Sequence, residues 1–178
     1  MNNSNVTIET KNLLLKSIAI DYVEDIFREF TSEITVFMSP QPAKKIDETI
    51  EFIETSIRGN VAGNNLQVVI LRKENGEFLG NAGLHHVDRK NPELGIWIKK
   101  SAHGNAFGKE AMTALKEWAD QNLDYEYILY PVVVENIASR RIPESFGGKV
   151  FREYDDVSAD GRKMHLVEYR IYNPKTKF

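Results

Sequence analysis

Three small residues, Gly104, Ala106 and Gly108, occupy alternate positions between an apolar run and an amphipathic stretch. At a turn, residues without large side chains let backbone N–H groups approach an anion closely. The amphipathic stretch predicts a helix over 106–122, and the positive end of its dipole would lie at the same turn. This combination is typical of a phosphate-binding turn and would accept a pyrophosphate, although a purely structural turn is the alternative interpretation.

The same turn is one of several blocks that match a known family. Residues 103–108 read His-Gly-Asn-Ala-Phe-Gly, a second block covers 135–148, and an opening pattern lies at 8–16. The first block resembles the coenzyme A signature of the GCN5-related N-acetyltransferase (GNAT) family. The second block and the opening resemble the branch of that family that acetylates ribosomal proteins at their amino termini. The resemblance spans nearly the whole chain.

This resemblance implies acetyl-CoA, or coenzyme A, as the cofactor. Its pantetheine arm would lie between two splayed strands, and an amide N–H near the end of the first strand would polarise the thioester carbonyl. The residues that the resemblance assigns to cofactor binding are Trp97, Ile98, His103, Gly104, Asn105, Ala106, Phe107, Gly108, Lys109, Asn136 and Ser139.

Acetyl transfer also needs a proton for the departing thiolate. Many members of the family use a tyrosine just before a helical glutamate, but this chain has Pro143 there, so Ser139 or bound water would serve instead. Asn136 keeps two interpretations, since Asn is a favoured helix N-cap and its amide would also be near the pantetheine.

The attacking amine must be neutral, which requires a general base. Glu93 is the first candidate, because it stands where histone-type members of the family carry a glutamate and burial would raise its pKa toward neutrality. His85 is the second candidate, since an ordinary histidine already titrates near neutral pH. For each residue, an ordinary structural or solvated role is the alternative.

Together these residues predict an acetyl-CoA-dependent N-acetyltransferase. Its acceptor would be a primary amine, either a protein N-terminus or a small molecule. Direct attack on the thioester is favoured, because the chain has no cysteine for an acetyl-enzyme and no Ser-His-Asp order. The alternatives are an antibiotic or metabolite acetyltransferase and a non-catalytic acyl-CoA sensor, the latter supported by the missing tyrosine.

The composition of the 178 residues argues against other classes of protein. The net charge of −3 argues against a basic face that would bind nucleic acid. A metal site is not expected, because the chain has no cysteine and its four histidines are scattered. The chain shows neither a secretion signal nor an apolar run of roughly 18 residues, so we expect no membrane association and a cytoplasmic location.

The elements that must position these residues follow from hydrophobic periodicity. The length and the 42% hydrophobic content predict a single domain over 1–178. The resemblance implies a cofactor half at 66–150 and acceptor-side helices at 19–58. Strands are predicted at 7–9, 13–17, 66–72, 78–85, 93–98, 127–134, 150–154 and 164–172, and helices at 20–30, 46–58, 106–122 and 137–146.

These elements predict an α+β fold with a mostly antiparallel sheet flanked by helices. Asn75-Gly76 is a hairpin signal between 66–72 and 78–85. Strands 93–98 and 127–134 are expected to be parallel, because a helix long enough for a crossover separates them, and the resemblance implies that they splay apart. The long final strands would also allow a homodimer.

Overall fold

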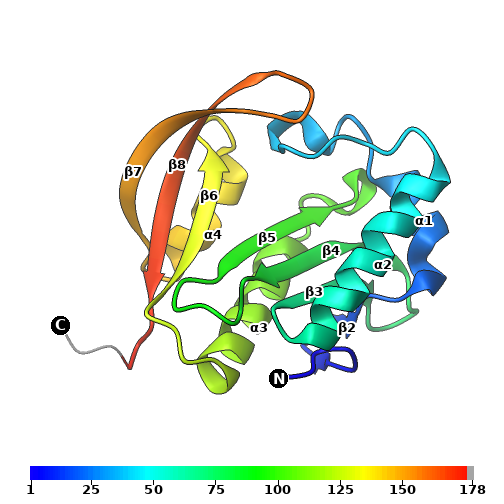
Figure 1. Ribbon diagram of the computed structural model, residues 1–178, viewed down its shortest axis with the longest axis horizontal. Helices are drawn as coiled ribbons and strands as arrows, with labels where there is room; N and C mark the ends of the chain where they lie inside the picture. The colour runs from blue at the N-terminus through cyan, green and yellow to red at the C-terminus, as the bar shows by residue number, and fades with distance from the viewer. Residues whose placement is uncertain (176–178) are drawn as a thin grey trace.

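The computed structural model describes residues 1–175, and at its centre is a mixed sheet of eight strands (Figure 1). The spatial order is β1-β2-β3-β4-β5-β6-β8-β7, and every neighbouring pair is antiparallel except β5 and β6. The predicted α+β class is confirmed. The strands are β1 (Thr7–Glu9), β2 (Leu13–Ser17), β3 (Asn65–Arg72), β4 (Phe78–His85), β5 (Glu93–Ile98), β6 (Tyr127–Val133), β7 (Lys149–Val157) and β8 (Lys163–Tyr172).

Helices cover both faces of this sheet. Helices α1 and α2 pack on one face of the β2–β5 half, α3 packs on the opposite face, and α4 lies against β6 and β8 (Figure 1). The helices are α1 (Val23–Glu29), α2 (Ile46–Ala62), α3 (Phe107–Asn122) and α4 (Ile137–Ser145), with 3-10 turns η1 (Ile20–Tyr22), η2 (Thr35–Phe37) and η3 (Lys100–Ala102).

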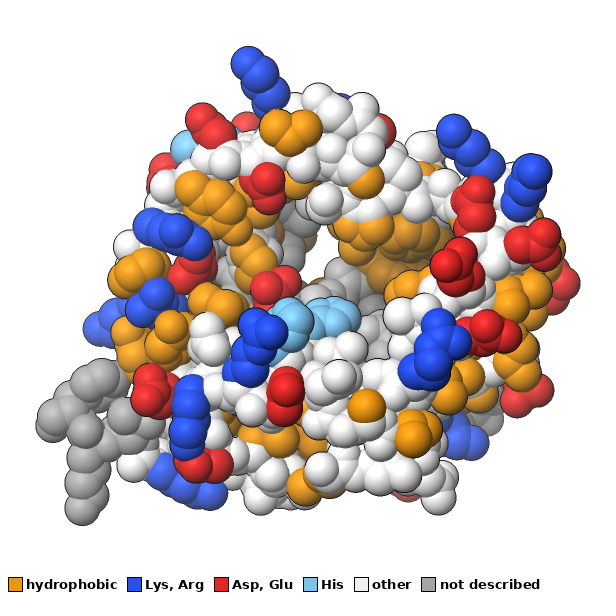
Figure 2. Space-filling view, viewed as in Figure 1, with side chains coloured by type: hydrophobic (Ala, Val, Ile, Leu, Met, Phe, Trp, Pro, Cys, Tyr) orange, Lys and Arg blue, Asp and Glu red, His pale blue; other side chains and the backbone are white. Residues whose placement is uncertain are grey.

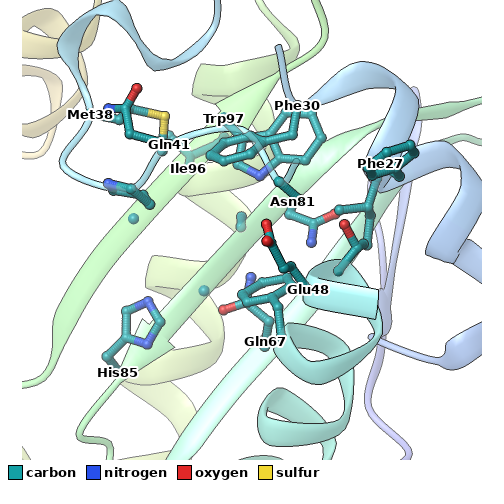
Figure 3. Close-up of a pocket in the computed structure, with 18 residues that line it drawn as sticks. Phe27, Phe30, Met38, Gln41, Glu48, Gln67, Asn81, His85, Ile96 and Trp97 are labelled. Carbon is teal, nitrogen blue, oxygen red and sulfur yellow. The ribbon is translucent and has the colours of Figure 1, made fainter. Parts of the chain in front are cut away.

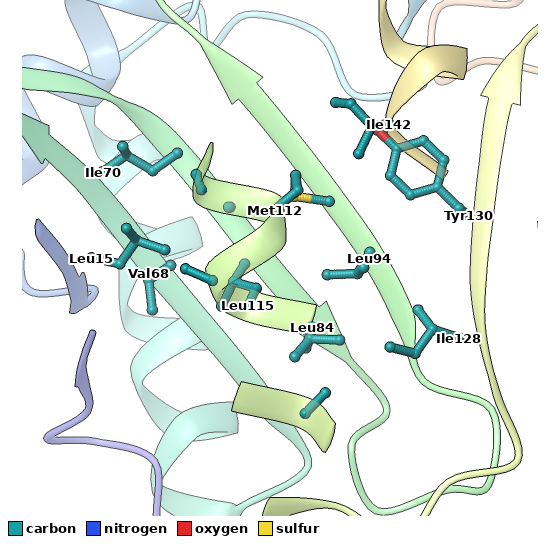
Figure 4. Close-up of a cluster of buried hydrophobic side chains, with 14 of the residues drawn as sticks. Leu15, Val68, Ile70, Leu84, Leu94, Met112, Leu115, Ile128, Tyr130 and Ile142 are labelled. Atoms are coloured by element: carbon teal, nitrogen blue, oxygen red, sulfur yellow. The ribbon is translucent and has the colours of Figure 1, made fainter. Parts of the chain in front are cut away.

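The alternation of side chains along β3 divides the core into two parts. Val68 belongs to the larger part, in which Met112 and Leu115 of α3 pack among strand residues (Figure 4). Val69, the next residue, packs on the other face with Ile53 of α2. Each fully buried side chain of this size stabilises the fold by about 1.5–3 kcal/mol relative to an exposed one. The core therefore fixes which face of β4 and β5 looks toward α1 and α2.

Two elements are longer than their sequence patterns predict. Helix α2 continues one turn past the predicted end at 58, until Gly63 adopts a left-handed conformation with φ of 75° and ends it. Strand β7 continues past the predicted end at 154 through Asp155 and Asp156 to Val157. Pairing with β8, including Asp155 opposite His165, outweighs the weak strand preference of aspartate.

Strands β5 and β6 are parallel, as predicted, but they pair only at one end. Glu93 is opposite Leu129, and the register continues no further. Beyond this pair the strands separate, so the backbone groups of β5 that face β6 have no ladder partner there. Helix α3 makes the crossover between the two strands (Figure 1).

The turn between β7 and β8 reaches across the molecule to the loop that contains η2 (Figure 1). Arg162 makes this bridge, because its Nη1 donates to the Val36 carbonyl at 2.8 Å and its Nη2 to the Met38 carbonyl at 3.1 Å. The bridge closes a ring around a central hollow, which has hydrophobic side chains inside it and acidic and histidine side chains at its rim (Figure 2). Among residues 1–175, no helix is long and apolar enough to cross a membrane.

Candidate active site

A cavity of about 590 Å³ opens where β5 and β6 separate. We call it the cofactor cavity. It lies between the end of β5, the start of α3 and the start of α4, so it brings together segments that are distant in the sequence. Ten of the eleven residues predicted to bind the cofactor line it: Trp97, Ile98, His103, Gly104, Ala106, Phe107, Gly108, Lys109, Asn136 and Ser139.

The turn before α3 has an unusual backbone that suits anion binding. Gly104 and Ala106 both adopt positive φ values, 81° and 60°, and no atom lies within 4 Å of the position that a Cβ would take at Gly104. The Glu110 N–H donates to the Ala106 carbonyl at 3.1 Å and closes the first turn of the helix. The N–H groups of 107–109 precede this bond and carry the partial positive charge of the helix start.

Two of the predicted cofactor residues hold the turn in place. Nε2 of His103 lies 2.7 Å from the Ile98 carbonyl oxygen, across the base of the turn. The Asn105 side-chain amide donates to the carbonyls of Ala102 and His103, at 3.2 and 3.1 Å, and Asn105 does not line the cavity. These contacts give both side chains a positioning role, because they fix the turn that precedes α3.

The charges of the cofactor cavity have one sign. Lys109 and Arg141 both line it, and its lining contains no aspartate or glutamate. This suits a cofactor with phosphate groups, because a nearby lysine or arginine side chain forms charge-assisted hydrogen bonds with a phosphate and so favours its binding. Arg141 was missed as a site residue, although it lies in the block at 135–148 that carries the family resemblance.

Ser139 lies in the first turn of α4 and its hydroxyl contacts a tyrosine. Oγ of Ser139 is 2.8 Å from the Tyr130 hydroxyl, and burial raises the pKa of Tyr130 to about 12. Tyr130 keeps its proton at neutral pH and lies in β6, not in the helix where a tyrosine was sought.

Asn136 is the N-cap of α4, because its Oδ1 accepts from the Ser139 N–H at 3.2 Å. Since Asn136 also lines the cavity, its two interpretations are compatible.

A second cavity, of about 420 Å³, lies on the other side of β5, under α1 and α2 (Figure 3). We call it the acceptor cavity. Met38, Ile96 and Trp97 line both cavities, so the two meet at the end of β5. The Trp97 ring packs against Phe30 with centroids 5.0 Å apart and forms an aromatic wall. The other apolar lining residues are Ile26, Phe27, Pro40, Ala43, Phe52 and Ala82.

His85 lines the acceptor cavity, as Figure 3 shows, and so does Gly95 of β5, which has no side chain. Gly83 and Gly95, which are paired across β4 and β5, also line it. A Cβ built at Gly95 would lie 3.9 Å from His85 Nε2 and would make only ordinary contact. Burial lowers the pKa of His85, and His86 lowers it further. The imidazole is therefore neutral at physiological pH and able to accept a proton.

Glu93 is directly opposite His85 in the register of β4 and β5, but it lines neither cavity. It lies at the end of β5 where β6 is paired, and His85 lies at the same end of β4, whereas the two cavities meet at the other end of these strands. Burial raises the pKa of Glu93, as the sequence predicted, and Glu168 raises it further. Of the three predicted catalytic residues, the structure brings Ser139 to the cofactor cavity and His85 to the acceptor cavity.

The acceptor cavity has the opposite charge preference to the cofactor cavity. Among the described residues that line it, Glu48 is the only acidic one, and none is a lysine or an arginine. Acidic side chains also stand at the rim of the central hollow (Figure 2). Two adjoining cavities, one for an anion and one for a cation or neutral amine, suit a transfer between two substrates. In the described part of the chain, no cluster of three histidine, cysteine, aspartate or glutamate side chains is arranged to hold a metal ion.

Comparisons with known proteins agree with this geometry. Residues 12–149 match the family model described as acetyltransferase (GNAT) domain. A Bacillus licheniformis protein named uncharacterized N-acetyltransferase p20 is 23% identical over 171 residues, which cover 93% of this chain and 95% of that protein.

Solved structures share the fold over nearly the whole chain. A GCN5-related N-acetyltransferase from Brucella melitensis has a TM-score of 0.80 at 16% identity, covering 97% of this chain and 81% of that one. RimL, a ribosomal L7/L12 alpha-N-protein acetyltransferase in complex with coenzyme A, has a TM-score of 0.84 at 15% identity, covering 94% of this chain and 98% of that one.

Proposed function

We propose an acceptor class and a set of catalytic residues for this protein, starting from one premise: the chain belongs to the GNAT acetyltransferase family. It is an N-acetyltransferase that uses acetyl-CoA. The acceptor is a primary amine, either of a small molecule or of a protein N-terminus, and it occupies the acceptor cavity. One observation carries this proposal: two cavities of complementary charge meet at Met38, Ile96 and Trp97.

The residues of the cofactor cavity fit acetyl-CoA, which supplies the acetyl group as a thioester. The N–H groups of 107–109, together with Lys109 and Arg141, would bind its phosphates. The backbone groups of β5 that have no partner on β6 would bind the pantetheine amides as another strand would. A backbone N–H at Trp97 or Ile98 would stabilise the negative charge that develops on the carbonyl oxygen.

His85 is the general base in this proposal. It lines the acceptor cavity and its imidazole is neutral, so it can take a proton from the acceptor ammonium before attack, or from the amine nitrogen as the new bond to carbon forms. Glu93 lies on the neighbouring strand, opposite His85. It would act on the acceptor only through a water molecule, or indirectly through the electrostatic effect of its carboxyl group on His85. We therefore give Glu93 a supporting role and keep its activity as a prediction to be tested.

The proton for the departing thiolate comes from Ser139, and Tyr130 restores it. Ser139 lines the cofactor cavity, and its hydroxyl is 2.8 Å from that of Tyr130. A phenol with a pKa of about 12 stays protonated at neutral pH but is still more acidic than a serine hydroxyl, so Tyr130 can return a proton to Ser139 and regain its own from solvent. The sensor interpretation depended on the absence of a tyrosine at Pro143, and this pair supplies a phenol from another element.

Two sources of the acceptor amine have support of different kinds. The similarity to RimL, an alpha-N-protein acetyltransferase, favours a protein N-terminus. The aromatic cavity of about 420 Å³ favours a compact amine, and either source would present only one small group to it. The amine of an antibiotic or a metabolite belongs to the second source, the compact small-molecule amines.

The test is release of free thiol from acetyl-CoA with purified protein and a panel of amines. The panel contains aralkylamines, polyamines, aminoglycosides, amino acids and peptides with free N-termini. We expect one group to raise the rate well above hydrolysis without acceptor. If coenzyme A binds tightly but no amine raises the rate, the transferase proposal is wrong for this panel and the sensor alternative is favoured.

A further inference from the structure

Asn81 is a buried amide without a partner. Its side chain is 1% exposed, it lines the acceptor cavity, and neither Nδ2 nor Oδ1 has a hydrogen-bond partner among the described residues. A buried polar group in this state costs stability, and such groups usually have a partner that the protein alone does not provide. Asn60, with the same 1% exposure, shows the ordinary case, because both of its amide atoms bond to the Gln67 backbone, at 2.9 and 2.8 Å.

The position of Asn81 makes it a contact for a ligand of this cavity. It is paired with Trp97 across β4 and β5, so the two side chains lie on the same face of the sheet. Trp97 is one of the three residues at which the acceptor and cofactor cavities meet. Figure 3 shows Asn81 beside the rings of Phe30 and Trp97. A polar group of an acceptor that reached Asn81 would therefore lie close to the transfer site.

The remaining polar groups of the cavity limit what that acceptor carries. Glu48 bears a negative charge, His85 is neutral, and the lining has no lysine or arginine. The adjoining opening adds Glu51, another carboxylate. An acceptor carboxylate in this cavity would lose its water without gaining a cation, which is strongly unfavourable. A neutral group that both donates and accepts hydrogen bonds would satisfy both atoms of Asn81.

We infer that Asn81 selects acceptors that have an apolar body and, near the amine, a neutral donor and acceptor group such as a carboxamide, and that carry no carboxylate. This inference rests on the proposed function, since it assigns the acceptor to this cavity. The required chemistry occurs in a small α-amino amide and in the first residue of a peptide. In both, the amine is followed by an amide in place of a free acid.

The experiment uses three amines with the same aromatic body: phenylalaninamide, phenethylamine and phenylalanine. Wild-type protein should acetylate the amide efficiently and the free acid at a rate lower by roughly 100-fold. In Asn81→Leu, which keeps the branching at Cγ and removes both polar atoms, kcat/KM should fall roughly tenfold for phenylalaninamide and stay within about twofold for phenethylamine. Comparing the variant with the wild type for each amine cancels differences in amine basicity.

Thermal unfolding gives a second readout. Asn81→Leu should raise Tm, because it removes two unpaired buried polar atoms, whereas Asn60→Leu should lower Tm, because it breaks two hydrogen bonds. A lower Tm in Asn81→Leu would mean that the amide has a structural role, and it would contradict the inference.

A short peptide that begins with phenylalanine distinguishes a protein N-terminus from a small-molecule acceptor, since only a protein-directed enzyme would prefer the peptide to phenylalaninamide.

Two kinetic outcomes would overturn the inference. One is an equal loss for all three amines in Asn81→Leu. The other is a wild-type preference for the free acid, or for amines without an apolar body such as polyamines. In that second case the acetyltransferase function stands and only the acceptor class is wrong. No turnover with any amine of any class would instead count against the proposed function.

Discussion

His85 and Glu93 lie opposite each other on adjacent strands, but only His85 lines the cavity in which the amine would react. Burial shifts their pKa values in opposite directions, since it disfavours the charged form of each group. The pKa of His85 falls and that of Glu93 rises. At neutral pH the histidine is ready to accept a proton, while burial makes the charged form of Glu93 costly.

Replacing His85 with Gln should lower kcat/KM by about 10²–10⁴-fold, the usual contribution of a general base. Because the folded-state pKa of His85 is below the ordinary 6.5, the wild-type rate should fall on the acid side with an apparent pKa under that value. That acid limb should disappear in His85→Gln. A pH–rate profile with the limb unchanged in the variant would show that another group is the base.

Replacing Glu93 with Gln should slow turnover less than His85→Gln does, with little change in coenzyme A affinity. It should also stabilise the protein at neutral pH. A carboxyl whose pKa is raised on folding binds its proton more tightly in the folded state, so stability falls as pH rises through that pKa. Melting curves should therefore show a higher Tm for the variant at pH 7.5, with the gain shrinking toward pH 4. A lower Tm at both pH values would contradict this.

The hydroxyl pair of Ser139 and Tyr130 gives a third prediction at this scale. Ser139→Ala should reduce kcat more than it raises the KM for the amine, because the proton is needed in the chemical step. Tyr130→Phe should give a smaller loss in the same direction, since water can restore the proton of Ser139. Steady-state kinetics with both substrates varied will measure this. If the double variant is no slower than wild type, water supplies the proton without the pair.

Sequence reasoning found some of these residues and missed others for physical reasons. Ser139 was found because it lies in a recognisable block, and His85 because of its ordinary pKa. Tyr130 was missed, since its contact with Ser139 joins a strand to a helix and leaves no spacing pattern. Asn81 was missed because an asparagine within an apolar strand looks like any other until its unpaired atoms are seen.

At the scale of elements, β5 lies between the two cavities, and its one glycine, Gly95, leaves room in the acceptor cavity. The sequence predicted β5, the turn at 104–108 and α3, since hydrophobic periodicity and small residues are local signals. It also predicted the parallel pairing with β6 through the length of the crossover. It did not predict how far β7 extends, because that depends on pairing with β8 and not on the residues of β7 alone.

Gly95→Val tests the role of this strand. The Cβ has open space, so the fold should tolerate the change, and valine suits a strand. Its methyl groups would occupy the acceptor cavity beside His85. We expect KM for the amine to rise at least about tenfold, while coenzyme A binds as in the wild type. An unchanged KM for the amine would show that the acceptor lies elsewhere.

At the scale of the whole molecule, the site depends on segments from both ends of the chain. Arg162, in the β7–β8 turn, bonds to the carbonyls of Val36 and Met38, and Met38 lines both cavities. The cofactor cavity carries Lys109 and Arg141 without a carboxylate, and the acceptor cavity carries Glu48 without a cation. No local sequence pattern predicts this division of charge, because it arises only when the sheet brings the two halves together.

The central claim is that the backbone around Gly108 and the start of α3 binds the phosphates of acetyl-CoA. Calorimetric titration with coenzyme A tests it most directly, with wild type, Gly108→Val and, as a matched control, Glu117→Val on an exposed part of the same helix. A Cβ at Gly108 makes only ordinary contacts, 3.8 Å from Ile98, so the variant should fold. We predict saturable binding by wild type and Glu117→Val and a loss of at least about 100-fold in Gly108→Val. Equal affinity in all three proteins, or no heat with the wild type, would contradict the account.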